Sequence, residues 1–323
     1  MSTDPSEVWQ LTLTVTRKSQ VADDIFMFEL RDAMGGELPE FTPGSHVAVT
    51  TPAGQKRRYS LCNDSMERDR YVIAVKQEKA GRGGSLSFTR DVNEGDTIQV
   101  DSPANEFEMS PAEPKNYIFI AGGIGITPIR SMIRHLMRRG KTNYKLYYFT
   151  RTPSMMAFRD EFSTSDFADK VVLHHDNADP DQAYDLWPVL EAQRGAHLYC
   201  CGPRGLMDAV RDMTGHWPDS AVHFEDFVGA TANRADDTAF TVKLVKSAKQ
   251  YEVAVGTSIL DTLRKGGHAL PSSCESGTCG TCRTRYTAGE PDHRDLVLSD
   301  REKKSEVMIC VSRSKTPELT LDI

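Results

Sequence analysis

The sequence predicts a multidomain chain: an N-terminal antiparallel β-barrel (residues 1–110), an α/β domain with a parallel sheet (111–226), a linker (227–238) and an α+β domain (239–323). In the first part, short runs that alternate apolar and polar residues are separated by turn residues, which is typical of antiparallel strands. In the second part, apolar β-rich runs alternate with amphipathic stretches, which favours a parallel sheet. In the last part, a hairpin and a short helix precede a run of cysteines.

The N-terminal module contains strand-like runs punctuated at Gly35-Gly36, Pro43-Gly44, Gly54 and Gly95-Asp96. Short strands with turn signals between them predict a small barrel or sandwich. The runs are WQLTLTVTRK, DIFMFELRD, SHVAVTT, RRYSL, YVIAVKQ and DTIQVD.

The central module begins with the strand YIFIAGG and the helix PIRSMIRHLMRRG, which Gly140 ends as a C-terminal cap. Further helices are expected near 155–163 and 203–213. The linker residues are small and polar and show no periodicity. In the last module, the hairpin pair TVKLVKS and QYEVAV is followed by a helix that starts with a capping box at Ser258 and Asp261.

The bulk composition excludes several classes of protein. With 39% hydrophobic and 26% charged residues, the chain is typical of a globular protein. No apolar run approaches the roughly 18–20 residues that span a membrane. The net charge of −7 gives no support to nucleic-acid binding. Seven cysteines without a secretory signal argue against a disulfide framework and predict a cytoplasmic protein.

The cysteine run has the spacing of an iron–sulfur site. Cys274, Cys279 and Cys282 lie in CESGTCGTC, and Cys310 follows in MICVS. The pattern C-x4-C-x2-C…C is the plant-type ligand spacing of a [2Fe–2S] cluster. A structural zinc site is the alternative, but zinc sites usually pair their ligands as C-x2-C…C-x2-C. A Rieske centre needs two histidines, and none lies in this run.

Two segments of the first module suit a flavin mononucleotide. In RRYSL, Arg57 suits a phosphate, Tyr59 the ribityl chain or ring face, and Ser60 the flavin N5. The segment from Gly81 to Ser85, which includes Arg82, Gly83 and Gly84, offers converging backbone N–H groups and a charge. The alternatives are an edge strand with a basic patch and a plain turn.

Two strand-to-helix turns of the second module suit a dinucleotide. Gly122-Gly123-Ile124-Gly125-Ile126-Thr127-Pro128 brings glycine backbone and a helix N-terminus toward a pyrophosphate, with Thr127 in reach of flavin or nicotinamide. Cys200-Cys201-Gly202-Pro203 follows another strand, and parallel sheets bind ligands at this edge. We expect Cys201 beside the nicotinamide and Cys200 in the core. A glycine-rich turn without a ligand is the alternative.

Taken in order, RxYSL, GGIGITP, CCGP and the cysteine pattern resemble the phthalate dioxygenase reductase family, and the resemblance extends over essentially the whole chain, including RDMTGHWP, PSSCESGTCG and DHRDLVLSD. It implies FMN, NADH and a [2Fe–2S] cluster in a plant-type, β-grasp-like ferredoxin domain. It also implies that Phe227 shields the flavin, with Glu225 close by. The resemblance assigns catalytic contacts to Ser60, Thr127, Cys201 and Phe227; cofactor contacts to Arg57, Tyr59, Ser60, Arg82, Gly83, Gly84, Ser85, Gly122, Gly123, Thr127, Gly202, Pro203, Glu225 and Phe227; and cluster ligation to Cys274, Cys279, Cys282 and Cys310.

The function so implied is the NADH-dependent reductase component of a two-component Rieske-type aromatic-ring oxygenase, a monomer that passes electrons from NADH through FMN and the cluster to the oxygenase. A reductase for a cytochrome or a separate ferredoxin is one alternative, and a non-catalytic redox-sensing module is another. The choice of coenzyme stays open: Asp176, Asp179 and Asp181 would repel the 2′-phosphate of NADPH, whereas Arg151 would attract it.

Overall fold

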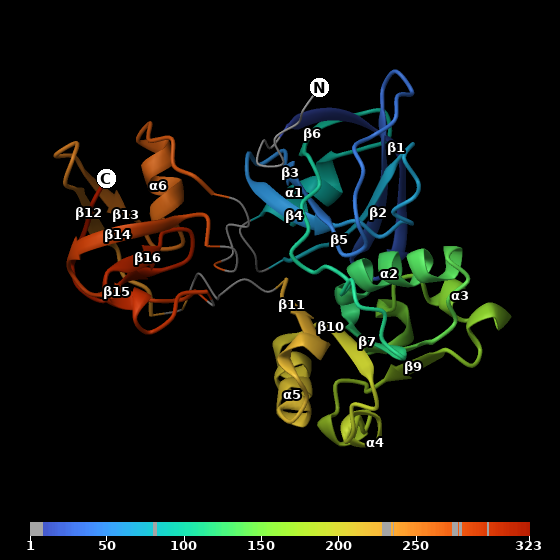
Figure 1. The fold of residues 1–323 in the computed structure, drawn as a ribbon. Helices are drawn as coiled ribbons and strands as arrows, with labels where there is room; N and C mark the ends of the chain where they lie inside the picture. The colour runs from blue at the N-terminus through green and yellow to red at the C-terminus, as the bar shows by residue number, and fades with distance from the viewer. Residues whose placement is uncertain are drawn as a thin grey trace. The chain divides into compact units, whose positions relative to one another are not determined.

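The computed structural model describes residues 9–79, 83–227, 234, 236–272, 277, 280–295 and 297–323. Contacts divide the chain into two compact units, residues 1–227 and 228–323 (Figure 1). The first unit contains the barrel and the parallel sheet, and the second contains the cysteine run. None of the helices in these described stretches is long and apolar enough to cross a membrane.

The first module is a six-stranded antiparallel sheet in the order β4-β3-β6-β1-β2-β5. A bridge between Leu61 and Ile73 joins its two outer strands, which closes the sheet into the expected barrel. Phe28, Val47 and Val100 lie among its fully buried core residues. Helix α1, which the sequence reading missed, follows β5. The elements are β1 (Gln10–Ala22), β2 (Ile25–Asp32), β3 (His46–Thr50), β4 (Lys56–Ser60), β5 (Tyr71–Lys76), α1 (Gly84–Asp91) and β6 (Thr97–Asp101).

The second module is a five-stranded sheet in the order β11-β10-β7-β8-β9, and every pair of neighbouring strands is parallel. Helix α2 ends at Arg138 with Arg139 as its C-cap, and Gly140, the cap that the sequence predicts, follows one residue later with a φ of 67° that allows the chain to turn. The helix expected near 155–163 is shorter and covers Arg159–Phe162, because Phe158 before it has a left-handed φ of 59° that a helix cannot contain. The main elements are β7 (Asn116–Gly122), α2 (Ile126–Arg138), β8 (Tyr144–Thr150), α3 (Arg159–Phe162), β9 (Val171–His175), α4 (Trp187–Leu190), β10 (Ala196–Cys201), α5 (Arg204–Thr214) and β11 (Val222–Glu225).

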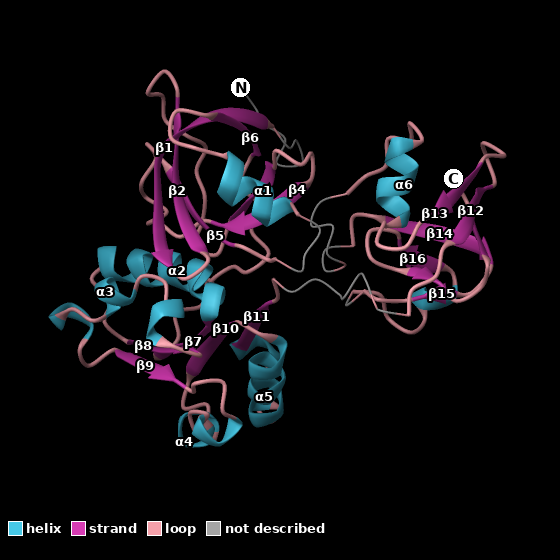
Figure 2. Ribbon diagram, turned by 180° about the vertical axis from the view of Figure 1, so that it is seen from behind, coloured by secondary structure: helices cyan, strands magenta, loops and turns pink. Residues whose placement is uncertain are grey.

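Helix α2 covers one face of the parallel sheet and helix α5 covers the other (Figure 2). On one face, α2 packs with Phe119 and Tyr199 into a cluster that also contains Ile25 and Ala74 of the barrel. On the other face, α5 packs against alternate residues of the same strands, including Cys200. Because successive strand residues point to opposite faces, Cys201 faces the barrel side and Cys200 the α5 side.

The second unit is a five-stranded sheet in the order β13-β12-β18-β14-β16, with the short pair β15–β17 beside it. Strands β12 and β18 are parallel and the other described pairs are antiparallel, which agrees with the expected β-grasp-like arrangement. Ser258 Oγ caps α6 by accepting the Asp261 N–H at 3.0 Å, as the capping box predicts. The elements are β12 (Phe240–Leu244), β13 (Gln250–Val253), α6 (Ile259–Lys265), β14 (Arg283–Ala288), β15 (Pro291–Asp292), β16 (Glu306–Met308), β17 (Arg313–Ser314) and β18 (Glu318–Leu321).

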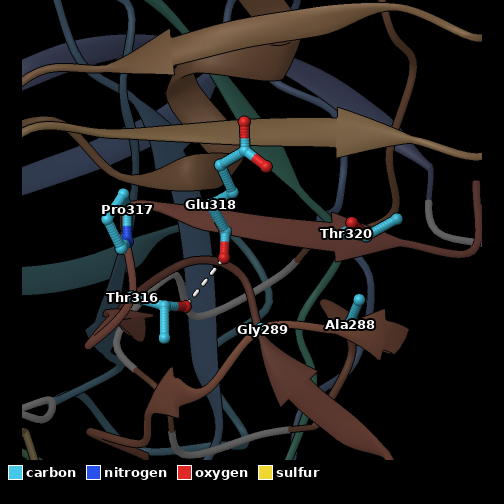
Figure 3. Close-up of a pocket in the computed structure, with 6 residues that line it drawn as sticks. All are labelled: Ala288, Gly289, Thr316, Pro317, Glu318 and Thr320. Carbon is cyan, nitrogen blue, oxygen red and sulfur yellow. Dashed lines mark hydrogen bonds between the residues drawn. The ribbon is translucent and has the colours of Figure 1, made fainter.

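A shallow surface pocket of about 350 Å³ lies in this unit at the end of β14 that is remote from Cys282 (Figure 3). Thr316 Oγ1 donates to the Glu318 carbonyl at 2.8 Å across its rim. The pocket contains none of the predicted site residues. Its lining residues are Ala288, Gly289, Thr316, Pro317, Glu318 and Thr320.

Candidate functional site

Strand β4 presents two buried hydroxyl groups, those of Tyr59 and Ser60, that no described residue satisfies. The Tyr59 ring lies 5.7 Å from the Phe88 ring between centroids, and its hydroxyl is buried. Neither this hydroxyl nor the Ser60 hydroxyl has a hydrogen-bond partner in the described part of the chain. Burial raises the pKa of Tyr59, so the phenol stays protonated and can donate. Buried polar groups normally have partners, so these two atoms suit the polar edge of a bound flavin.

Arg57 and the start of helix α1 lie close together. A Cβ at Gly84 would come within 2.9 Å of Arg57 Nε and 2.7 Å of Gln55 Oε1, so this glycine allows the helix start to approach the arginine. Gly83 precedes the helix with a left-handed φ of 85°. Ser85 Oγ accepts the Glu78 N–H at 3.0 Å, which fixes the first turn. A guanidinium beside a helix N-terminus suits a phosphate. Arg82 lies outside the described residues.

The two dinucleotide turns meet backbone to backbone. A Cβ at Gly122 would come within 2.4 Å of Pro203 Cδ, and a Cβ at Gly125 would come within 2.1 Å of the Cys201 carbonyl oxygen. The neighbouring strands β7 and β10 therefore end in one crevice, at the point of the sheet where the strand order reverses. Thr127 Oγ1 donates to the Ile124 carbonyl at 3.0 Å, so its hydroxyl already stabilises the turn.

Replacement of Gly125 by Ala is expected to disrupt this crevice, because the added methyl group would overlap backbone that cannot rotate away. Strain of this kind costs about 1–3 kcal/mol or more, and dinucleotide binding should weaken with it. Gly205→Ala is the matched control, since a Cβ there meets nothing within 4 Å. Titration of both variants with NADH measures the effect. Equal affinities in the two variants would contradict the predicted overlap.

Strand β11 brings a buried carboxyl group to the same crevice. Glu225 pairs with Cys201 in the β10–β11 register, and its Oε2 is buried with no hydrogen-bond partner among the described residues. The pKa of Glu225 is raised to about 8, mainly by burial; the charge of Arg58 opposes this rise, the charge of Glu106 adds to it, and the nearby Ser60 hydroxyl opposes it. Burial also raises the pKa of the Cys201 thiol, so this side chain acts as a small neutral surface. Phe227, two residues after Glu225, has an exposed fraction of 38%.

The sequence reading missed the polar side chains around Glu225. Arg58 Nε donates to His46 Nε2 at 2.6 Å, and Arg58 Nη2 lies 2.7 Å from Glu106 Oε2. The sequence could have indicated this arrangement, because side chains alternate along a strand: Arg58 and Ser60 lie on one face of β4, and Arg57 and Tyr59 lie on the other.

Two of the four predicted cluster ligands are described, and both are buried. The β14–β16 ladder pairs Arg283 with Met308, and the Ile309 N–H donates to the Cys282 carbonyl at 3.4 Å, so Cys282 lies beside the segment that contains Cys310. Gly280 has a left-handed φ of 82°, which allows a tight loop around a cluster. Cys274 and Cys279 lie outside the described residues, and no metal-binding group of three His, Cys, Asp or Glu occurs among the residues that are described.

Comparison with known proteins supports each module. Residues 12–109 match the family described as an oxidoreductase FAD-binding domain, 119–212 an oxidoreductase NAD-binding domain, and 242–315 a 2Fe-2S iron-sulfur cluster binding domain. The fold and these matches define a flavin- and NAD-dependent oxidoreductase that carries its own [2Fe–2S] domain.

Whole-chain relatives narrow this class. The chain is 50% identical over 322 residues to phthalate dioxygenase reductase of Burkholderia cepacia, covering 99% of this chain and 100% of the relative. It is 50% identical over 312 residues to the phthalate 4,5-dioxygenase oxygenase reductase subunit of Pseudomonas putida, covering 96% of each. A solved phthalate dioxygenase reductase, described as a modular structure for electron transfer from pyridine nucleotides to [2Fe-2S], superimposes with a TM-score of 0.90 at 50% identity, covering 97% of this chain and 98% of that one. The chain belongs to the phthalate dioxygenase reductase family, which confirms the resemblance noted in the sequence.

Proposed function

We propose that the protein is the NADH-dependent reductase component of a two-component Rieske-type aromatic-ring oxygenase. The observation that carries the proposal is the 50% identity to a phthalate dioxygenase reductase across the flavin, NAD and [2Fe–2S] modules together. When bound, the flavin accepts a hydride from NADH and passes electrons singly to the cluster, which delivers them to the oxygenase. A reductase for a cytochrome or a separate ferredoxin is less well supported, because both relatives described above are named as reductases of phthalate dioxygenases.

We assign the domains as residues 1–110 for FMN, 111–226 for NADH, 227–238 as linker and 239–323 for the cluster. In the first, the Tyr59 and Ser60 hydroxyl groups orient the flavin ring, and Arg57 with Arg82, Gly83, Gly84 and Ser85 holds a terminal phosphate. We assign FMN rather than FAD because FMN ends in a single phosphate, whereas FAD continues through a pyrophosphate to an adenosine. The buried Tyr59 and Ser60 hydroxyl groups, which have no hydrogen-bond partner among the residues that the structure describes, support the assignment.

In the second domain, Gly122, Gly123, Gly202 and Pro203 receive the dinucleotide backbone at the β7–β10 crevice. Thr127 fixes the turn, and Cys201 presents a neutral wall to the nicotinamide. Glu225 and Phe227 lie on the flavin side of the crevice. Phe227 covers the flavin ring where the nicotinamide binds, and it moves aside when NADH binds. In the last domain, Cys274, Cys279, Cys282 and Cys310 hold the cluster as thiolates.

Replacement of Arg57 by Ala is expected to weaken FMN retention by about 1.5–3 kcal/mol, because a charge-assisted contact to the phosphate is lost. Dialysis followed by measurement of flavin per protein tests this. Lys18→Ala is the matched control, since its ammonium group binds the Val92 carbonyl at 2.7 Å rather than β4. Equal flavin retention in both variants would overturn the assignment of Arg57.

The proposed function is tested by mixing the anaerobic holoprotein with NADH and then with candidate oxygenases. Flavin absorbance should bleach before, or together with, cluster absorbance, and the oxygenase should turn over its aromatic substrate. A colourless protein would favour the non-catalytic alternative. Reduction of cytochrome c without turnover by any Rieske oxygenase would favour another acceptor.

We propose a cytoplasmic monomer, since NADH is a cytoplasmic reductant and that compartment keeps thiols reduced. The choice of coenzyme depends on the charges near the ribose 2′ position. Asp176 and Asp179 follow β9 at the ligand-binding edge of the sheet. Asp179 stabilises a local turn by accepting the Asp181 N–H at 3.0 Å. This acidic turn supports NADH over NADPH.

A further inference from the structure

We propose that Arg130 and Ser131 of α2 are positioning residues for the reaction between NADH and the flavin. They fix the helix that receives the dinucleotide to the backbone directly beyond the flavin-binding strand. The inference rests on the proposed function and deepens it, because it assigns a role in that reaction to two residues outside the cofactor contacts.

Two consecutive side chains of α2 bind two consecutive carbonyl groups of the barrel. Arg130 Nη1 donates to the Cys62 carbonyl, and Ser131 Oγ donates to the Asn63 carbonyl at 2.8 Å. Arg130 is 8% exposed and Ser131 is fully buried. Because neighbouring donors meet neighbouring acceptors, the helix cannot slide or rotate on the barrel without breaking both hydrogen bonds.

The barrel segment that accepts these bonds is itself fixed to β5. The Asn63 side-chain oxygen accepts the Val72 N–H at 3.0 Å, and its amide donates to the Arg70 carbonyl at 3.1 Å. The Cys62 N–H donates to the Val72 carbonyl at 2.9 Å. The segment is therefore part of the closed barrel, so that a displacement of α2 on it is a displacement relative to the whole flavin domain.

The two bonds lie close to both proposed ligands along the chain. Cys62 is two residues beyond the end of β4, the strand that carries the proposed flavin contacts, and two residues span at most about 7 Å. Arg130 is three residues after Thr127 of the glycine-rich turn, which is about one helical turn of roughly 5.4 Å. The bonds thus form a short link between the two ligand-bearing elements.

The buried charge of Arg130 adds direction to this link. Arg130 Nε donates to Glu161 Oε2 at 2.9 Å, and the guanidinium carbon lies 4.5 Å from the centre of the Phe158 ring. A buried ion pair contributes little net stability, and apolar side chains of similar size often replace one without loss. The planar guanidinium has donors in a fixed geometry, so it holds the Cys62 carbonyl and Glu161 at the same time.

Hydride transfer is sensitive to positioning of this kind. The reacting atoms must approach to about 3–3.5 Å, and a misplacement of about 1 Å can lower the rate about 100-fold. A helix that is held less firmly still offers its glycine-rich turn to the dinucleotide. Loss of the two bonds should therefore lower the rate of flavin reduction at saturating NADH and leave the affinity for NADH nearly unchanged.

Arg130→Met, Ser131→Ala and the double variant test the inference in the FMN-loaded holoprotein. Stopped-flow mixing with NADH separates the dissociation constant from the limiting rate of flavin reduction. In the double variant we expect the limiting rate to fall about 10–100-fold and the dissociation constant to change by less than about threefold, with a smaller fall in each single variant. A tetrahydro analogue of NADH, which donates no hydride, gives a readout without turnover. The long-wavelength absorbance that arises when a nicotinamide stacks on a flavin should weaken in the same order.

Two control variants remove similar groups that bind elsewhere. Arg134→Met removes an equal charge from α2, and Arg134 binds the other oxygen of Glu161 at 2.8 Å, which keeps this carboxylate paired in Arg130→Met. Thr214→Val removes a buried hydroxyl group of α5 that donates to the Val210 carbonyl of its own helix at 2.7 Å. Both controls should keep the limiting rate and the stacking absorbance.

The inference is overturned if the double variant keeps its limiting rate, or if either control loses as much. It is also overturned if the loss of rate comes with an equal rise in the dissociation constant and a loss of flavin, since general damage then explains the result. If the double variant does not fold, Ser131→Ala decides alone, because it removes a single oxygen atom. Failure of the proposed function is different: the unaltered holoprotein would then show no flavin reduction by NADH.

Discussion

Replacement of Cys310 by Ser is expected to remove the [2Fe–2S] cluster and to lower cytochrome c reduction by at least about 100-fold. A hydroxyl is a poor ligand for iron, and loss of even an outer partner of a metal ligand typically costs about 10–100-fold in affinity or activity. NADH should still reduce the flavin, because the flavin and NAD modules form a separate compact unit, residues 1–227. Iron per protein, cytochrome c reduction and anaerobic flavin bleaching measure the three effects.

Cys62→Ser is the matched control for this experiment. Cys62 is also buried, but it lies in the first unit and its Sγ donates to the Val72 carbonyl at 3.2 Å, a bond that a serine hydroxyl can replace. The control should keep its iron and its cytochrome c reduction. Retention of both properties by Cys310→Ser would show that this cysteine is not a cluster ligand. Loss of iron with full cytochrome c reduction would show that the order of electron transfer is wrong.

The parts of the fold that were predicted correctly are those with local signals. The six alternating runs of the first module correspond to β1–β6, because a strand with one buried face imposes a period of two on its own residues. The cap at Ser258 was also predicted correctly, and the predicted cap at Gly140 lies one residue beyond the observed C-cap, Arg139, since helix ends depend on residues within one helical turn. The cysteine spacing specified the [2Fe–2S] cluster by itself, whereas the choice of FMN and NADH came from the whole-chain resemblance.

The parts that were missed depend on long-range contacts. Helix α1 has eight residues and no acidic residue in its first turn, and it is stabilised by the fully buried Phe88, whose environment the sequence does not reveal. The contacts of Arg58 with His46 and Glu106 join residues from β4, β3 and the segment after β6, which meet only after the barrel forms. Spacing likewise predicted the four cysteines as ligands but not that Cys282 would lie beside Ile309.

A buried ion-pair network in the second unit was likewise invisible in the sequence. The Asp237 carboxylate accepts from Arg294 at 2.5 and 3.1 Å and lies 3.7 Å from Arg313 Nε, and the three side chains are 2–4% exposed. Arg313 also donates to the Thr238 and Thr257 carbonyl groups at 3.0 and 2.8 Å. The network therefore ties the residues that precede β12 to the strands of the cluster domain.

Burial alone would raise the pKa of Asp237, but hydrogen bonds from Arg294 outweigh it and the pKa is lowered. A lowered pKa in the folded state means that the carboxylate stabilises the fold above its unfolded pKa of about 3.9. This contribution is lost as pH falls through the lower folded value. At neutral pH the Asp237 carboxylate therefore makes its full contribution to the stability of the second unit.

Replacement of Asp237 by Ala is expected to cost the second unit up to about 3–5 kcal/mol, because the buried guanidinium groups of Arg294 and Arg313 then share one nearby carboxylate, Asp292, which lies 2.6 Å from Arg294. Against a typical stability of about 5–15 kcal/mol this is a large fraction. Urea unfolding followed by cluster absorbance should show an earlier transition, while flavin absorbance, which reports on the first unit, should change little. Glu290→Ala, which breaks the exposed Lys315–Glu290 pair of 2.8 Å, should cost far less stability, because solvent screens an exposed pair. If the two variants lost equal stability, the buried network would contribute no more than a surface pair, and the linker end would need another anchor.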